Sequence, residues 1–132
     1  MNYQILKEKP PHWDKLLEKF PNADEKTVAV TYGDKIYCQC DMSEDLLTHE
    51  LVHVQQQTKM GRDIWWDEYM KNPLFVYEQE LEAYREQYAF FVKKYAGDRN
   101  RLFRIKYAIA KILSGPLYNN AKTHSEVMKE LE

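Results

Sequence analysis

The sequence predicts a single α+β domain over residues 1–132 that is mostly helical, with a small β-hairpin or sheet beside one helix. At 132 residues with 44% hydrophobic content, the chain can bury one core but is too short for two ordinary domains. Helical periodicity dominates after residue 43, and a short alternating segment precedes it. These observations together favour helices packed beside a small sheet.

The first third of the chain predicts one short helix and then a hairpin. Pro10-Pro11 opens a helix that runs to about Lys19, with Trp13 and Leu16 on its buried side. Residues 27–32 and 35–40 alternate in polarity, and the intervening Gly33-Asp34 predicts a tight turn.

Two cysteines lie on the second arm of this hairpin. Cys38 and Cys40 are two residues apart, so on a strand their side chains share one face. Neighbours of this kind do not readily bridge, and the spacing is not that of a C-x-x-C motif. We therefore expect two reduced cysteines that serve packing, with a second metal site as the alternative.

The next segment carries the most informative motif, His49-Glu50-Leu51-Val52-His53, inside a predicted helix from about Ser43 to Met60. Residues four apart on a helix lie one turn apart on the same face, so both imidazoles can reach one metal ion. Zinc accepts nitrogen ligands and lowers the pKa of bound water, and an adjacent carboxylate can take the proton. This pattern predicts His49 and His53 as zinc ligands and Glu50 as the general base. Two structural histidines on a core helix are the alternative.

The remaining segments predict further helices. Asn72-Pro73 and Gly97 bracket a long one, and two more follow over residues 98–113 and 123–131, the last opened by a capping box. Between the first two helices, residues 61–72 hold Trp65, Trp66 and Tyr69, which either line a pocket or cap the core.

The long helix offers three glutamates as a third ligand. At about 100° per residue, Glu80 lies roughly 65° from the centre of the apolar stripe, Glu78 roughly 95° and Glu82 roughly 135°. Glu80 therefore borders the core, where a metal between two packed helices would lie. Glu82 is expected to face water.

The motif His49–His53, followed by Glu80-Leu81-Glu82-Ala83, resembles the gluzincin class of zinc metallopeptidases, most closely the ImmA/IrrE-like and HtpX-like peptidase cores. That resemblance implies a zincin-like domain in which the first glutamate of the E-x-E-A pattern, Glu80, binds Zn²⁺. HtpX-like members usually place an aspartate after the alanine, to support a ligand histidine, where this chain has Tyr84. The segment Leu113–Tyr118 also resembles small zincin-like proteins of tailed phages.

The resemblance implies further roles. In zincins a sheet edge beside the site pairs with extended substrate, and the arm Ile36–Cys40 is the candidate here. Independently of the resemblance, peptide hydrolysis at zinc needs a hydrogen-bond donor to the developing oxyanion, and Tyr84 and His124 are the candidates.

The favoured function is therefore a zinc-dependent peptidase acting on a peptide or protein substrate. A non-catalytic zincin-fold binding module, such as a virion component or regulator, is the alternative. A formal net charge of −2 gives no general signature of nucleic-acid binding, although basic residues concentrate in the C-terminal third. No apolar run approaches the roughly 18–20 residues of a membrane span, and the N-terminus lacks a signal sequence. We expect a cytoplasmic protein or, if phage-encoded, one of the virion or host cytoplasm.

Overall fold

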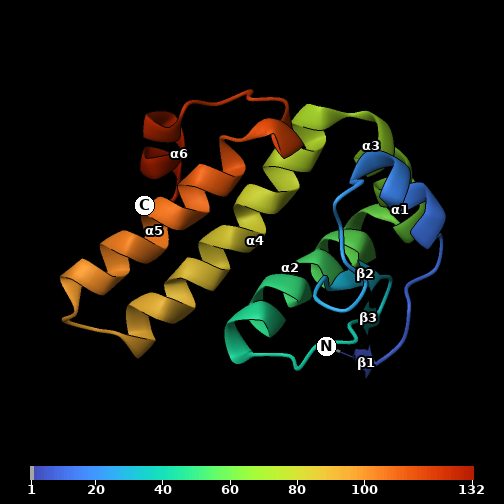
Figure 1. The fold of residues 1–132 in the computed structure, drawn as a ribbon. Coiled ribbons are helices and arrows are strands. Elements are labelled where there is room, and N and C mark those ends of the chain that lie inside the picture. The colour runs from blue at the N-terminus through green and yellow to red at the C-terminus, as the bar shows by residue number, and fades with distance from the viewer. Residues whose placement is uncertain (1) are drawn as a thin grey trace.

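The computed structural model describes residues 2–132 and confirms a mostly helical α+β fold with a small sheet (Figure 1). The elements in chain order are β1 (Gln4–Leu6), α1 (Trp13–Lys19), β2 (Val30–Tyr32), β3 (Lys35–Tyr37), α2 (Glu44–Met60), α3 (Arg62–Lys71), α4 (Pro73–Lys94), α5 (Arg99–Leu113), the 3₁₀ turn η1 (Pro116–Tyr118) and α6 (His124–Glu130). No helix within residues 2–132 has an apolar run long enough to cross a bilayer.

The hairpin is present, but a third strand joins it. The strand order is β1-β3-β2, with β1 parallel and β2 antiparallel to β3. Gly33 has a φ of 69°, which a two-residue hairpin turn requires at its first central position. Because β3 pairs on both sides, the expectation that the arm Ile36–Cys40 offers a free edge to substrate is wrong. The edge strand that packs on α2 is β2.

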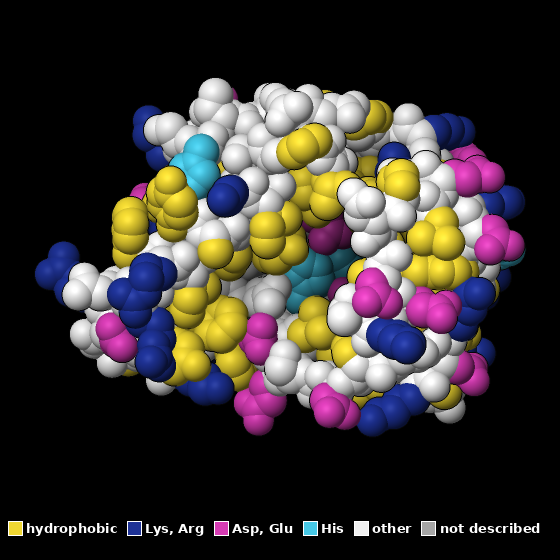
Figure 2. Space-filling model, in the orientation of Figure 1, with side chains coloured by type: hydrophobic (Ala, Val, Ile, Leu, Met, Phe, Trp, Pro, Cys, Tyr) yellow, Lys and Arg dark blue, Asp and Glu magenta, His cyan; other side chains and the backbone are white. Residues whose placement is uncertain are grey.

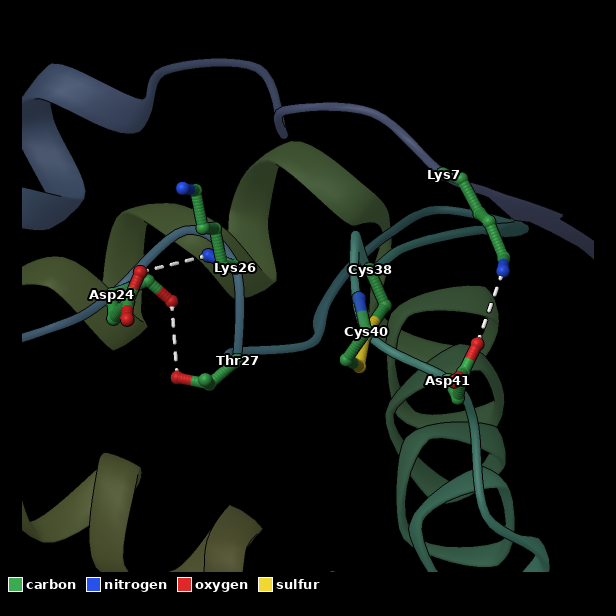
Figure 3. The surroundings of a disulfide bond; sticks show 7 residues. All are labelled: Lys7, Asp24, Lys26, Thr27, Cys38, Cys40 and Asp41. Carbon is green, nitrogen blue, oxygen red and sulfur yellow. Dashed lines mark hydrogen bonds and ion pairs between the residues drawn. A yellow bond between two sulfur atoms is a disulfide. The ribbon is translucent and has the colours of Figure 1, made fainter.

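The structure pairs Cys38 and Cys40 as a disulfide (Figure 3), so the expectation of two reduced thiols is wrong. That expectation assumed a straight strand through Cys40, whereas β3 ends at Tyr37 and the chain bends at residues 39–40. The bend brings the two Cα atoms to 5.2 Å, within the range that disulfides span. Nearby, Lys7 and Asp41 form an exposed ion pair between the segments that follow β1 and β3.

Helix boundaries follow the predicted caps closely. The α4 helix starts where Asn72 accepts a hydrogen bond from the Phe75 amide, with Pro73 in the first turn. Thr123 and Glu126 form the predicted capping box of α6. The segment after Gly61 folds as α3, which the sequence analysis left without an assigned structure.

The long helix α4 buries two faces. Tyr77, Leu81 and Tyr88 belong to the main hydrophobic core, which they share with α5 residues such as Leu113. The other face carries Glu80, Ala83 and Gln87 toward α2, and α2 with α4 forms the most extensive contact between elements. Ala83 is fully buried there, and a small side chain allows two helices to approach closely. This approach brings Glu80 to the histidines of α2.

Gln57 fastens the hairpin to α2. Its side-chain amide donates to the Thr31 carbonyl at 2.9 Å, and its oxygen accepts from the Gly33 amide at 2.6 Å. Thr31 in turn places its hydroxyl 3.3 Å from the backbone carbonyl of Glu50. One buried glutamine therefore sets the position of β2 relative to the H-E-x-x-H helix.

Replacing Gln57 with leucine should lower the free energy of unfolding by about 1–3 kcal/mol or more, because a buried polar group without a partner costs that much. Urea unfolding measures the change. The matched control is Gln55→Leu, since Gln55 is exposed on the same helix and should change stability by less than about 0.5 kcal/mol. Equal stability of the two variants would show that this tether contributes nothing.

Candidate metal site

The structure brings His49 and His53 on α2 together with Glu80 on α4. The Nε2 atom of His49 lies 3.0 Å from one Glu80 carboxylate oxygen, and the Nε2 atom of His53 lies 3.2 Å from the other. The two Nε2 atoms are 3.3 Å apart. All three side chains are buried, and as a group they can hold a metal ion.

These separations match a tetrahedral metal centre. Ligand atoms about 2.0–2.1 Å from zinc, at tetrahedral angles, lie about 3.3–3.4 Å apart. The observed 3.0–3.3 Å separations among the two imidazole nitrogens and the carboxylate oxygens approach this value. Three protein ligands leave a fourth corner free.

Glu50 lies beside this cluster. Its carboxylate oxygen is 3.9 Å from the Nε2 atom of His49, and Glu50 is outside the group of three with ligand geometry. The side chain is 4% exposed, and this burial raises the pKa of its carboxyl group, an effect that the neighbouring histidines oppose. A carboxylate next to a metal position, but not in it, has the placement that a general base requires.

Two aromatic residues of α3 complete the wall around Glu80. The Tyr69 hydroxyl donates to a Glu80 carboxylate oxygen at 2.9 Å, and its ring stacks on Trp65 at 4.7 Å. The Trp65 ring packs against His53 with its centroid 5.6 Å away. Trp65 and Tyr69 therefore serve both alternatives left open by the sequence, because they are buried in the core and also enclose the site. The role of Tyr69 had no sequence signal, since it depends on how α3 packs.

The other imidazole nitrogens contact glutamines. The Nδ1 atom of His49 lies 3.0 Å from the Gln87 side-chain oxygen, and that of His53 lies 2.9 Å from the Gln56 oxygen. Gln87 donates to Asp45 at 2.8 Å, and Gln56 donates to Glu82 at 3.1 Å. Each histidine is thus linked to an acid through the amide of a glutamine.

The other residues that the sequence suggested for the site lie at different distances from the cluster. Glu78 is exposed and outside the cluster, and Glu82 is exposed as expected. Tyr84 packs its ring against His49 at a centroid distance of 4.5 Å, so it borders the site. His124 lies on α6, which packs mainly on α5, and its Nε2 atom contacts the Tyr107 carbonyl at 3.2 Å. This contact draws His124 away from the cluster.

In the metal-free chain, attraction between the histidines and the Glu80 carboxylate stabilises the cluster. Burial opposes the charge on His53, but the attraction of Glu80 outweighs it and raises the pKa of His53 to about 9. Burial likewise opposes ionisation of Glu80, yet the neighbouring histidines hold the pKa of its carboxyl group well below the ordinary value. A proton on His53 therefore balances the Glu80 carboxylate in the metal-free chain.

Figure 2 shows a hollow near the middle of one face, with histidine and acidic side chains at its floor and hydrophobic side chains around its rim. His49 is 6% and His53 is 5% exposed, and Glu80 is 7% exposed, so narrow parts of their surfaces are open to water. The site is recessed but reachable from outside.

Comparisons with protein families, with characterised proteins and with solved structures find no match to this chain.

The raised pKa of His53 predicts different pH dependences of stability with and without metal. In the metal-free chain, the proton on His53 should contribute full stability below about pH 6.5, the ordinary histidine value, and this contribution should disappear as pH rises through about 9. With metal, stability should instead rise as pH increases through about 6.5 and then stay level, because the metal-bound chain lacks the proton that the unfolded chain holds below that pH. Thermal unfolding with chelator and with zinc measures both. The same pH slope in both samples would contradict the assignment.

Proposed function

We propose that the chain is a zinc-dependent metallopeptidase. The observation that carries the proposal is the cluster of His49, His53 and Glu80 at tetrahedral spacing, with the Glu50 carboxylate beside it and not within it. Nitrogen and carboxylate ligands in a set of three, with an open fourth corner, are typical of catalytic zinc. A purely structural zinc site is normally closed by a fourth protein ligand and needs no adjacent base.

The residues have distinct roles in this proposal. Zinc, when bound, supplies Lewis acidity that lowers the pKa of water and polarises a carbonyl group. Glu50 takes the proton from the attacking water and passes it to the leaving amine. Tyr69 holds the Glu80 carboxylate in place, and the rings of Trp65 and Tyr84 beside the histidines limit access of bulk water.

The edge strand β2 lies beside the base, since the Thr31 hydroxyl contacts the Glu50 backbone carbonyl. The Thr31 carbonyl already accepts a hydrogen bond from Gln57, so pairing of an extended substrate with this edge would require that bond to open.

A non-catalytic binding module is the second candidate, and the burial of the cluster favours it. Each ligand side chain is less than one-tenth exposed, so only a small part of the cluster surface can meet a substrate. Such a module would bind zinc for stability and recognise a partner through its surface.

Hydrolysis of a peptide mixture separates the two candidates. The zinc-loaded chain should generate new peptide termini, detected by mass spectrometry, and chelation should stop the reaction until zinc is restored. Retention of zinc with no cleavage of any peptide would favour the binding module.

A further inference from the structure

Both ligand histidines are held by glutamines whose orientation is itself fixed. Gln87 contacts the Nδ1 atom of His49 with one end and Asp45 with the other. Gln56 contacts the Nδ1 atom of His53, and its other end reaches both Glu82 and the backbone carbonyl of Gln79.

These partners determine which end of each amide faces which group. An ionised carboxylate and a backbone carbonyl can only accept hydrogen bonds, so each must meet the NH₂ group of its glutamine. The glutamine oxygen therefore faces the imidazole. An oxygen that can only accept requires a proton on Nδ1, so Nε2, which faces the Glu80 carboxylate in the metal-free chain, is the nitrogen left for a metal.

We propose that Asp45, acting through Gln87, and the Gln79 carbonyl with Glu82, acting through Gln56, hold both histidines in the tautomer that can bind a metal. Asp45, Gln87 and Gln56 are thus positioning residues. The proposal depends on the metal-binding part of the proposed function and is independent of peptidase activity. It also explains how the chain supports His49 with Tyr84 where the HtpX-like pattern has an aspartate.

The hydrogen-bond chain to His49 differs from the one to His53 in one way that makes the proposal testable. Among the described residues, Asp45 is the single acceptor that orients Gln87, whereas Gln56 is oriented by a backbone carbonyl as well as by Glu82. The backbone carbonyl remains when Glu82 is changed. Loss of the Asp45 charge should therefore matter much more than loss of the Glu82 charge.

The first experiment compares zinc dissociation constants for Asp45→Asn and Glu82→Gln, measured by competition with a chromophoric chelator. The introduced asparagine can present either its oxygen or its NH₂ group, so Gln87 loses its fixed orientation. Asp45→Asn should weaken zinc binding roughly 10–100-fold, the usual cost of losing a partner of a metal ligand. Glu82→Gln should bind zinc nearly as the unmodified chain does. Equal losses in the two variants would overturn the proposal.

Glu44→Gln is the matched control for position. Glu44 and Asp45 are both acids in the first turn of α2, but Glu44 is exposed. A general effect of negative charge at the start of this helix would weaken zinc binding in both variants. The proposal predicts a loss in Asp45→Asn alone.

A second variant tests the hydrogen-bond chain from Asp45 through Gln87 to His49 by exchanging the positions of its amide and carboxylate groups. In Gln87→Glu, two carboxylates face one another, and zinc binding should weaken. Combining this change with Asp45→Asn restores an acceptor on Nδ1 with an amide behind it, so zinc binding should recover. If the double variant binds zinc no more tightly than Gln87→Glu, the proposed hydrogen-bond chain is contradicted.

Nitrogen-15 NMR of the zinc-loaded chain reads directly which ring nitrogen carries the proton. Both rings should carry it on Nδ1, with Nε2 facing the metal position. A proton on Nε2 of His49, with the metal on Nδ1, would overturn the proposal. A chain that shows Nδ1 protons and binds zinc but cleaves no peptide would refute the proposed function and leave the inference standing.

Discussion

Replacing Glu50 with glutamine should abolish peptide hydrolysis while zinc stays bound. Glutamine keeps the shape of the side chain but cannot accept the proton from water, and removal of such a group typically costs roughly 10²–10⁴-fold in rate. The three ligand positions are untouched, because Glu50 lies outside the cluster. Peptide cleavage and zinc content, measured on the same preparation, test both parts of this prediction.

The control for this variant is Glu86→Gln, since Glu86 is exposed on α4. It should cleave peptides at the unmodified rate. Cleavage by Glu50→Gln at that same rate would exclude Glu50 as the base. Loss of zinc from Glu50→Gln would show instead that Glu50 is needed to form the metal site.

Replacing Glu80 with alanine should cause the largest loss of metal affinity. The change removes one of three ligands, so the loss should exceed the ~100-fold upper range typical of residues that act behind a ligand. It also leaves the buried Tyr69 hydroxyl without its acceptor and removes the charge that raises the pKa of His53. Calorimetric zinc titration measures the loss, and thermal unfolding confirms that the variant is folded.

Glu78→Ala is the matched control, because Glu78 lies two residues away on the same helix and is exposed. It should bind zinc as the unmodified chain does. A chain that loses zinc through Glu78→Ala but keeps it through Glu80→Ala would reverse the assignment of the third ligand.

The helices could be predicted because their signals are local. Asn72-Pro73 before α4 and the Thr123–Glu126 capping box of α6 act within one turn of backbone. The placement of Glu80 followed from helical geometry, since residues 80, 83 and 87 share the face toward α2. This face lies beside the aromatic stripe that packs toward α5, which is why Glu80 was expected at the border of the core.

Other features depend on contacts between distant segments and left no local pattern. β1 is three residues long and exists through parallel pairing with β3, more than 30 positions away in sequence. That pairing turned the expected edge strand into the central one. α3 escaped prediction because adjacent Trp65 and Trp66 in a charged segment give no clear helical period.

The hydrogen-bond partners of the ligand histidines likewise could not be predicted from the sequence. The motif predicts a metal on His49 and His53, but the partners of their other nitrogens come from one turn away on α2 and from a second helix, α4. Glutamine is common on helix surfaces, so nothing marks Gln56 or Gln87 before α2 and α4 are packed together. Three-dimensional structure was needed to find them.

The most direct test of the account is the metal content of the full chain, determined by elemental analysis after purification without added metal and again after incubation with zinc. The account predicts close to one zinc per chain, held by His49, His53 and Glu80. A chain that contains no zinc and takes up none on addition would contradict it.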